Sequence, residues 1–319
     1  MFAQSFQDIQ GVNDLRSRLE TTLGRGYAIE RELAGGAASR LFLAIETALN
    51  RKVVVKVLAS EAASDVGAAR FKQEMELTAQ LQHPHILEVL TAGASDDLLY
   101  YVMPYVAGES LRRRLEREGR LPVADAILVL REVADALAFA HAHGIVHRDI
   151  KPENILLQGG HAVIMDFGVA RALLAARGGR RLTDPGTTVG TVGYMAPEQA
   201  AGDRDVDARA DVYALGVVGY EMLTGAPPFT GSTVQAVVAA HQTQLPVSPH
   251  DVRAEIPSDV SAAVLMALAK DPAARFQTAA DFRDAMPGPA ELLPPGRRSG
   301  LRALAASFAA LAGFRRRRP

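Results

Sequence analysis

The stretch His147-Arg148-Asp149-Ile150-Lys151-Pro152-Glu153-Asn154 decides the fold of this chain, and Asp166-Phe167-Gly168 follows it twelve residues past Asn154. Each segment lies beside a short apolar run such as Ile155-Leu156-Leu157. Mg²⁺ prefers hard oxygen ligands, and a hydroxyl that accepts a phosphate needs a carboxylate within reach of its proton. Two Asp and one Asn on short loops therefore predict a site for Mg²⁺ and a triphosphate.

At this spacing the two segments resemble the catalytic loop and the metal-binding loop of a eukaryotic-type (Hanks-type) Ser/Thr protein kinase. The resemblance implies that Asp149 accepts or orients the substrate hydroxyl's proton and that Lys151 neutralises the transferring γ-phosphate of ATP. It also implies that Asn154 and Asp166 hold Mg²⁺. The Asp-x-Lys-Pro-Glu-Asn pattern is typical of Ser/Thr kinases, not tyrosine kinases. The Pro-Glu-Gln ending at residues 197–199 is most similar to the bacterial branch.

Composition narrows the class of protein. The chain has 319 residues, is 48% hydrophobic and 22% charged, and carries a net charge of −1, which fits a soluble globular protein without a nucleic-acid partner. It has no Cys, so disulfides and thiolate metal sites are excluded. Residues 1–10 lack the pattern of a signal peptide, and no apolar stretch reaches the roughly 18 residues of a spanning helix. We therefore expect a cytoplasmic protein.

Short apolar and β-branched runs between Gly and Asn turns indicate a β-meander in the first part of the chain. Helical periodicity precedes it at residues 8–24 and interrupts it once, at residues 68–81. The predicted strands are Tyr27–Leu33, Leu41–Ile45, Val53–Leu58, Leu87–Leu90 and Leu98–Met103.

Helical periodicity takes over after residue 108, with Ser110, Ser258 and Thr278 as expected N-caps. The predicted helices cover residues 110–118, 123–143, 208–223, 233–241, 258–269 and 278–285. The sequence therefore predicts an α+β chain with a β-rich and an α-rich lobe, as in the two-lobed protein kinase fold, with ATP in the cleft. The expected division is a lead-in helix (1–26), a kinase domain (27–286: small lobe 27–103, hinge 104–108, large lobe 109–286) and a Pro-rich linker with a basic tail (287–319).

The family's phosphate-covering loop, Gly-x-Gly-x-x-Gly-x-Val, has only a partial counterpart here. Gly36 is the middle glycine, whereas Ala34 and Ser39 stand for the other two and Leu41 for the valine. Glycine lets the backbone approach a phosphate and adopt positive φ, so we expect altered cover, improved by glycine at positions 34 and 39. The expected nucleotide contacts in this loop are Leu33, Ala34, Gly35, Gly36, Ala37, Ala38, Ser39 and Leu41.

Lys56 has apolar neighbours on both sides in a predicted strand, where an unpaired Lys is costly. The resemblance implies that Lys56 holds the α- and β-phosphates and pairs with Glu74 on the predicted helix. Glu76 is the rival partner, but it lies two residues further on and points to another side of the helix. The alternative is an edge-strand Lys that faces solvent.

The connection between the lobes begins at Met103-Pro104-Tyr105-Val106. The resemblance implies that the carbonyl of Pro104 and the N–H of Val106 bind adenine and that Met103 lies beside the adenine pocket. Proline lacks an N–H but keeps its carbonyl, so it removes nothing needed. A simple linker between the lobes is also compatible with this stretch.

Gly190-Thr191-Val192-Gly193-Tyr194-Met195-Ala196-Pro197-Glu198 resembles the Gly-Thr-x-x-Tyr-x-Ala-Pro-Glu ending of the family's activation segment. The resemblance implies that Thr191 touches Asp149 and Lys151 and shapes the acceptor site. It further implies that Glu198 pairs with Arg275 and that Asp211 braces the catalytic loop. Surface charges are the alternative for these last three residues.

Arg148 precedes Asp149 and, by the resemblance, receives a phosphate from the activation loop. Residues 168–190 contain four Arg and one acid, so this segment repels itself. Its hydroxyls Thr183, Thr187 and Thr188 are candidates for autophosphorylation in trans, which requires a homodimer, at least transiently; we favour Thr183 and Thr187.

The tail has two interpretations. Residues 301–314 carry an apolar helical face beside seven Arg at positions 297, 298, 302 and 315–318. Such a segment can bind an anionic membrane surface, which would make the protein peripheral there. A solvated tail without a membrane contact is the alternative.

Three functions compete. The first is an active Ser/Thr protein kinase that phosphorylates protein substrates with ATP and Mg²⁺. The second is a nucleotide-binding scaffold with little turnover, which the altered glycine loop favours. The third is a small-molecule phosphotransferase of similar fold, which the Ala-Pro-Glu segment and Thr191 argue against.

Overall fold

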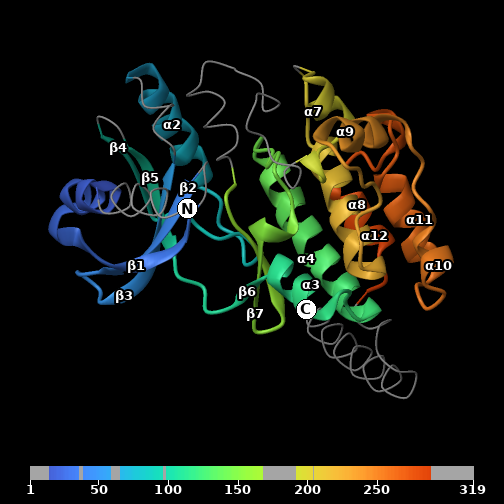
Figure 1. Ribbon diagram of the computed structural model, residues 1–319, viewed down its shortest axis with the longest axis horizontal. Helices are drawn as coiled ribbons and strands as arrows, with labels where there is room; N and C mark the ends of the chain where they lie inside the picture. Colours follow the sequence, from blue (N-terminus) through green and yellow to red (C-terminus); the bar gives the residue numbers. More distant parts are fainter. Residues whose placement is uncertain are drawn as a thin grey trace, which may run out of the picture.

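The computed structural model describes residues 14–35, 39–58, 65–95, 98–167, 192–203 and 205–288. An antiparallel sheet of order β1-β2-β3-β5-β4 forms one end of the molecule, and helices form the other (Figure 1). The strands of this sheet are β1 (Tyr27–Gly35), β2 (Ser39–Glu46), β3 (Arg51–Leu58), β4 (Thr91–Ser95) and β5 (Leu98–Pro104). The predicted α+β class with a β-rich and an α-rich part is confirmed.

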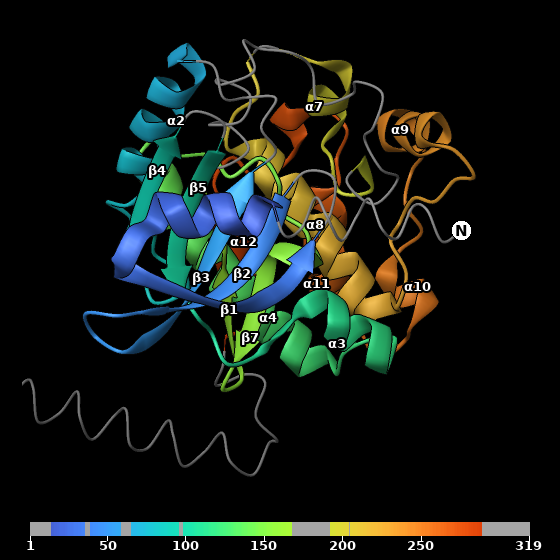
Figure 2. The same ribbon diagram turned by 60° about the vertical axis from the view of Figure 1, so that its left-hand side comes forward.

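Both faces of the sheet are covered by a helix. Helix α2 (Asp65–Thr78) packs its buried Phe71 and Met75 against one face. The helix of residues 14–23 crosses strands β1 to β3 on the other face, where Leu19 is fully buried (Figure 2). Because side chains alternate along a strand, Val53, Val55 and Val57 face the helix of residues 14–23, whereas Val54 and Leu58 face α2. This alternation also directs Lys56 to the α2 side, toward the helical part of the molecule.

The predicted strand Leu87–Leu90 is wrong, since the strand at this edge is β4, four residues later. Of the apolar residues that suggested it, Leu87 and Val89 pack against the cluster around α2, and Leu90 packs against the cluster around the helix of residues 14–23. Ile86 forms a bridge with Ile164, the N–H of Leu87 donates to the carbonyl of Ile164 (2.8 Å), and Ile86 is buried in the helical core. The edge strand itself is made of small residues and carries little apolar signal.

The helical part is built around α4 (Val123–Ala142) and α8 (Arg209–Thr224), and α8 is buried from Ala210 to Leu223. Ser110 and Thr278 are N-caps, but α11 begins at Ser258 and has Pro257 as its N-cap. The remaining helices are α3 (Leu111–Glu118), α7 (Pro197–Ala201), α9 (Val234–Thr243), α10 (Pro249–Val252), α11 (Ser258–Ala267) and α12 (Ala279–Ala285), with 3₁₀ turns η1 (Gly24–Gly26), η3 (Pro152–Asn154) and η4 (Pro272–Ala274).

A small sheet of order β6-β7-β8 lies between these two parts. Its strands are β6 (Glu109–Ser110), β7 (Ile155–Gln158) and β8 (His161–Ile164). The loop between α4 and β7 carries Asp149 and Asn154, and Asp166 follows β8. The β7–β8 hairpin therefore brings the two predicted loops side by side. No helix of the described part of the chain is long and apolar enough to cross a bilayer.

Candidate active site

One buried carboxylate binds the backbone of the loop that precedes β7. Asp211, in the first turn of α8, accepts hydrogen bonds from the backbone N–H groups of His147 (2.8 Å) and Arg148 (2.7 Å). Arg148 adopts φ +67°, an unfavourable conformation for a non-glycine residue. In this conformation the backbone amides of His147 and Arg148 both point to the Asp211 carboxylate. Burial alone would raise the pKa of Asp211, but hydrogen bonds with His141 and the loop hold the pKa below its usual value.

Asp149 sits at the centre of a compact set of polar contacts. Lys151 Nζ lies 2.7 Å from Asp149 Oδ2, and Asn154 Nδ2 donates to the same carboxylate oxygen (2.9 Å) and to the backbone carbonyl of Asp149 (2.7 Å). The Asp149 side chain remains one-third exposed (33%), so a substrate hydroxyl can reach it. Both amide hydrogens of Asn154 are directed to Asp149, which leaves the Asn154 amide oxygen for another ligand.

Asp166 is buried and forms an ion pair with Lys56 of β3. Its other carboxylate oxygen accepts a hydrogen bond from the Tyr101 hydroxyl on β5. Burial would raise the pKa of Asp166, but the Lys56 cation and these hydrogen bonds lower the pKa below the ordinary value. Asp166 also adopts φ +68°, an unfavourable conformation for a non-glycine residue. The loop after β8 and the five-stranded sheet are thus linked through one carboxylate.

The expected partner of Lys56 differs from the one in the structure. Lys56 pairs with Asp166, and no Lys56–Glu74 ion pair occurs within the described residues. A carboxylate as buried as Asp166, whose side chain is 6% exposed, needs a nearby cation more than the half-buried Glu74 does. The Lys56–Glu74 pair therefore remains a proposal for another arrangement of α2.

His147 connects the two loops, a role that the sequence reasoning missed. Its Nε2 lies 2.9 Å from the Met165 carbonyl oxygen, and its ring packs edge-on against Phe167 at 4.7 Å between centroids. His147 is fully buried. A buried aromatic with two ring nitrogens needs polar partners, so its place between two polar loops could have indicated this contact. The sequence reasoning also missed Tyr101, although a buried hydroxyl requires an acceptor and could have indicated a polar partner.

Apolar residues of both parts of the molecule form one cluster at the place where the sequence predicts adenine. Met103 on β5 belongs to the same cluster as the half-buried Leu33, Leu41 and Leu156. Leu156 on β7 was not singled out in the sequence. Pro104 is the last residue of β5, and Val106 follows in the connection to β6. Ala34 and Gly35 end β1, and Ser39 begins β2. Gly36, Ala37 and Ala38 lie outside the described residues.

The donor set at this site fits Mg²⁺ held with a nucleotide. Asn154 and Asp166 supply an amide oxygen and a carboxylate, both hard ligands, from neighbouring loops. Among the described residues, no group of three or more His, Cys, Asp or Glu side chains could hold a metal by itself. Mg²⁺ typically uses one or two carboxylates together with substrate phosphates, so this sparse set suits a metal that arrives with ATP.

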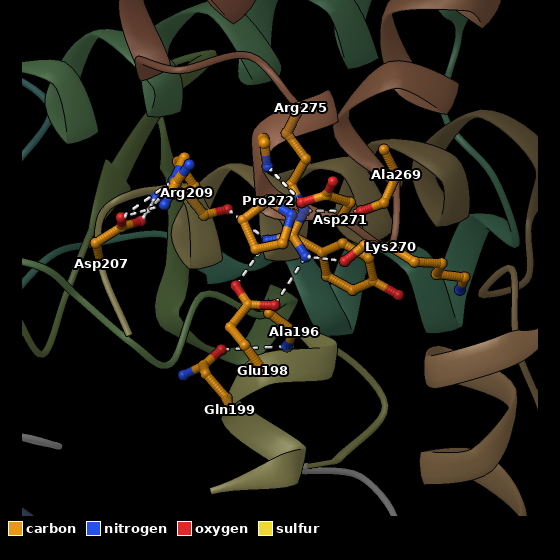
Figure 3. A network of polar contacts seen from close by, with 12 residues as sticks. Ala196, Glu198, Gln199, Asp207, Arg209, Ala269, Lys270, Asp271, Pro272 and Arg275 are labelled. Carbon is orange, nitrogen blue, oxygen red and sulfur yellow. Dashed lines mark hydrogen bonds and ion pairs between the residues drawn. The ribbon is translucent and has the colours of Figure 1, made fainter. Parts of the chain in front are cut away.

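Glu198 and Arg275 form a bidentate ion pair that ties α7 to the turn before α12 (Figure 3). The two nitrogen–oxygen distances are 2.7 and 2.8 Å, and the Arg275 side chain is fully buried. The remaining N–H groups of Arg275 donate to backbone carbonyls, those of Ala269, Lys270 and Arg209. The pair anchors the segment that follows Thr191 to the helical core.

The sequence model of the protein kinase domain matches residues 27–284. This chain belongs to the protein kinase domain family. The serine/threonine-protein kinase PknB of Mycobacterium tuberculosis (strain ATCC 25618 / H37Rv) is 43% identical over 263 residues, which cover 81% of this chain and 42% of PknB. PknB of Mycolicibacterium smegmatis matches to the same extent. PknA of Mycobacterium tuberculosis (strain ATCC 25177 / H37Ra) is 38% identical over 296 residues, which cover 88% of this chain and 67% of PknA.

The chain thus spans about two-fifths of the length of the PknB relatives. Several expected residues of this protein kinase domain lie outside the described part of the structure. They are Thr183, Thr187, Thr188 and Thr191 of the activation segment, Gly168, and the whole tail from residue 289.

Proposed function

We propose that this chain is a Ser/Thr protein kinase that transfers the γ-phosphate of ATP to Ser or Thr hydroxyls of proteins. The observation that carries the proposal is the arrangement around Asp149, whose carboxylate lies 2.7 Å from Lys151 Nζ and 2.9 Å from Asn154 Nδ2. Asp166, on the neighbouring loop, forms a buried ion pair with Lys56 of β3. The family's use of ATP and Mg²⁺ and the similarity to the serine/threonine-protein kinases PknB and PknA support the same activity.

Each residue has a definite task in this reaction. The substrate hydroxyl oxygen bonds to the γ-phosphorus, the bond from that phosphorus to the β–γ bridging oxygen breaks, and ADP leaves. Asp149 receives or orients the hydroxyl proton, and Lys151 offsets the charge on the transferring group. Lys56 binds the α- and β-phosphates, while Asn154 and Asp166 would hold Mg²⁺, which neutralises the phosphate oxygens. Positioning and charge supply the rate enhancement.

The proposal extends to regulation and partners. We expect autophosphorylation of the activation segment in trans, through a homodimer that forms at least transiently. Protein substrates are the expected partners, and the expected location is cytoplasmic. The basic tail is a candidate for contact with an anionic membrane, and flotation with anionic liposomes of the full chain against a chain ending at Met286 tests this contact.

A radiolabel transfer assay tests the activity. The wild-type chain with Mg²⁺-ATP should label itself and a generic basic protein, whereas Asp149→Asn should lower the rate at least about 100-fold with an unchanged circular dichroism spectrum. Nucleotide binding with no transfer by the wild type would favour the scaffold. Transfer to small metabolites but not to proteins would favour the phosphotransferase.

A further inference from the structure

Arg112, on α3, joins four elements of the helical part through one guanidinium group. Its Nε donates to Glu153 of η3 (2.9 Å) and its Nη1 to Glu221 of α8 (2.8 Å). Its Nη2 donates to the hydroxyl of Tyr194, in the segment before α7. Sequence reasoning assigned no role to Arg112, Glu153, Tyr194 or Glu221.

The base of this network is buried. The Glu221 side chain is 8% exposed, and it also accepts a hydrogen bond from the Tyr194 hydroxyl at 2.5 Å. Burial, together with the Glu221 carboxylate, raises the pKa of Tyr194 well above its usual range, so Tyr194 remains a donor. Arg112 is therefore the cation that faces Glu221, and a guanidinium is the group best shaped to bridge two carboxylates.

A cavity of about 490 Å³ opens beside this network. Its walls include Glu153, four residues after Asp149, and Tyr194, three residues after Thr191, together with Arg112 and the exposed Glu116. Catalytic-loop and activation-segment residues thus share one cavity. The cavity therefore lies beside the loop that carries Asp149, where a protein segment that presents its hydroxyl to Asp149 would pass.

The charge of the cavity depends on Arg112. Glu116 and the partly exposed Glu153 lie on its walls, and Glu221 lies behind Arg112. Without Arg112, three carboxylates would surround this space with no cation among the cavity residues. Such a site would bind an arginine side chain of a substrate, because arginine makes bidentate contacts with carboxylates. With Arg112 in place, the chain's own guanidinium binds two of these carboxylates, those of Glu153 and Glu221.

We propose that Arg112 is a specificity-determining residue that fills an arginine-binding position in the acceptor groove, so that the enzyme selects neutral residues there over arginine. This inference rests on the proposed kinase function and deepens it, because it names the class of protein sequence that the groove accepts. Arg112 acts by charge and occupancy in the groove, not on the transferred phosphate.

The test compares peptide preference in the wild type and in Arg112→Ala. Serine peptides with an alanine background carry one arginine at each flanking position in turn, and kcat/KM is measured relative to the all-alanine peptide. The wild type should show no gain from arginine at the position that reaches the cavity. Arg112→Ala should raise the relative kcat/KM for arginine at that position roughly fivefold or more.

Two further variants separate occupancy from general charge and from folding. Arg113→Ala removes the same charge from the next residue of α3, which is exposed and does not line the cavity, and it should leave the preference unchanged. Arg112→Ala/Glu221→Gln removes the uncompensated buried carboxylate, keeps the cavity open, and should retain about half or less of the gain.

The outcomes are distinct. An unchanged arginine preference in both Arg112 variants, or an equal gain in Arg113→Ala, overturns the inference while leaving the kinase function intact. A wild type that labels no peptide and no protein counts against the proposed function itself. The preference is a ratio of kcat/KM values within one variant, so a merely structural loss would lower all peptides alike and leave the ratio unchanged.

Discussion

Lys56 and Asp166 are 110 residues apart in the sequence, yet their side chains form an ion pair that connects the five-stranded sheet to the loop after β8. The two side chains are only 13% and 6% exposed. Removal of one partner from such a pair leaves a buried charge without compensation, which is far costlier than loss of a surface pair. The pair that would position ATP and Mg²⁺ therefore also holds the two parts of the molecule together.

Lys56→Met should lower the rate of phosphate transfer at least about 100-fold and also destabilise the protein. Loss of the cation leaves the Asp166 carboxylate buried, and we expect a cost of about 3 kcal/mol in the free energy of unfolding, measured by urea titration. Lys56→Met/Asp166→Asn should recover much of this stability but no activity. Lys52→Met, at an exposed position of the same strand, is the control and should change neither property. Equal stability of the single and double variants would contradict the coupling.

Glu198→Ala should destabilise the protein by about 3–5 kcal/mol, because it leaves the fully buried Arg275 guanidinium without its carboxylate. Thermal or urea unfolding measures the change. Glu255→Ala removes an exposed carboxylate from Arg253, which keeps its hydrogen bonds to the carbonyls of Leu121 and Leu223, and should produce no measurable change. If the two variants unfold alike, the Glu198–Arg275 pair does not anchor α7.

His241 should make stability fall as the solution becomes acidic. Burial, with the nearby Lys270 cation, lowers the pKa of His241 to about 4, and its Nδ1 lies 2.9 Å from the Tyr213 hydroxyl. In the unfolded chain this histidine takes up a proton near pH 6.5, whereas in the folded chain it does so only near pH 4. The free energy of unfolding therefore decreases as the pH falls from about 6.5 to about 4 and is constant below that range.

The change attributable to His241 should approach about 3 kcal/mol at pH 4. Urea titrations from pH 7 to about pH 4.5 measure it, and His241→Gln should flatten the profile while keeping an acceptor for Tyr213. His143→Gln, at an exposed helix end, should leave the profile as in the wild type. Parallel profiles of His241→Gln and the wild type would refute the assignment.

Glycine at positions 34 and 39 should not improve ATP binding, contrary to the expectation from the family's loop pattern. Ala34 pairs with Leu41 and Ser39 with Leu58 in strands, and the described non-glycine residues with positive φ are Asn50, Arg148 and Asp166. Extended backbone imposes no cost on alanine or serine. Ala34→Gly/Ser39→Gly should change the KM for ATP less than about threefold and lower stability by about 0.5–1 kcal/mol per site. A tenfold fall in KM would show that the loop needs both glycines.

Sequence periodicity located most strands and helices because the apolar faces of this fold are regular. Alternation along residues 53–58 placed valines on both faces of the sheet, and helical spacing placed α4 and α8. The strand at Thr91–Ser95 was missed because small edge residues carry no apolar signal, while the apolar residues before it pack against the hydrophobic clusters on the two faces of the sheet without forming a strand.

For the site, the spacing of the motifs and their resemblance to the family predicted that Asp149, Asn154 and Asp166 lie on adjacent loops and that Glu198 pairs with Arg275. It could not choose the partner of Lys56, because that choice depends on which carboxylate is more deeply buried. Contacts made by single side chains over long separations, such as His147 with Met165 or Arg112 with Glu221, leave no periodic pattern and emerge only from the folded chain.

Arg148 is the residue expected to receive an activation-segment phosphate. Its side chain is half-buried, its Nη2 donates to the Val206 carbonyl (3.1 Å), and its Nε is buried without a hydrogen-bond partner among the described residues. A buried guanidinium N–H without an acceptor is costly, and a phosphate oxygen would satisfy it with a charge-assisted bond. Arg148 thus has capacity for one more anionic partner.

Phosphorylation of Thr183 or Thr187 should therefore raise activity, because a phosphate adds a charge of about −1.5 to −2 that can bond to Arg148 and order the acceptor site. Thr188, three residues before Thr191, is closer to the acceptor site and is the less favoured hydroxyl.

Mass spectrometry of the wild type should find phosphate on these threonines and none in Asp149→Asn, and the labelling rate should rise faster than linearly with enzyme concentration if transfer occurs in trans. A variant with alanine at Thr183, Thr187 and Thr188 should lose most peptide phosphorylation, whereas alanine at the exposed Thr243, at the end of α9 and outside the cavity beside Arg112, should not. Phosphate absent from all three threonines in the active enzyme, or full activity of the triple variant, would refute the switch, because Arg148 would then have no anionic partner to recruit.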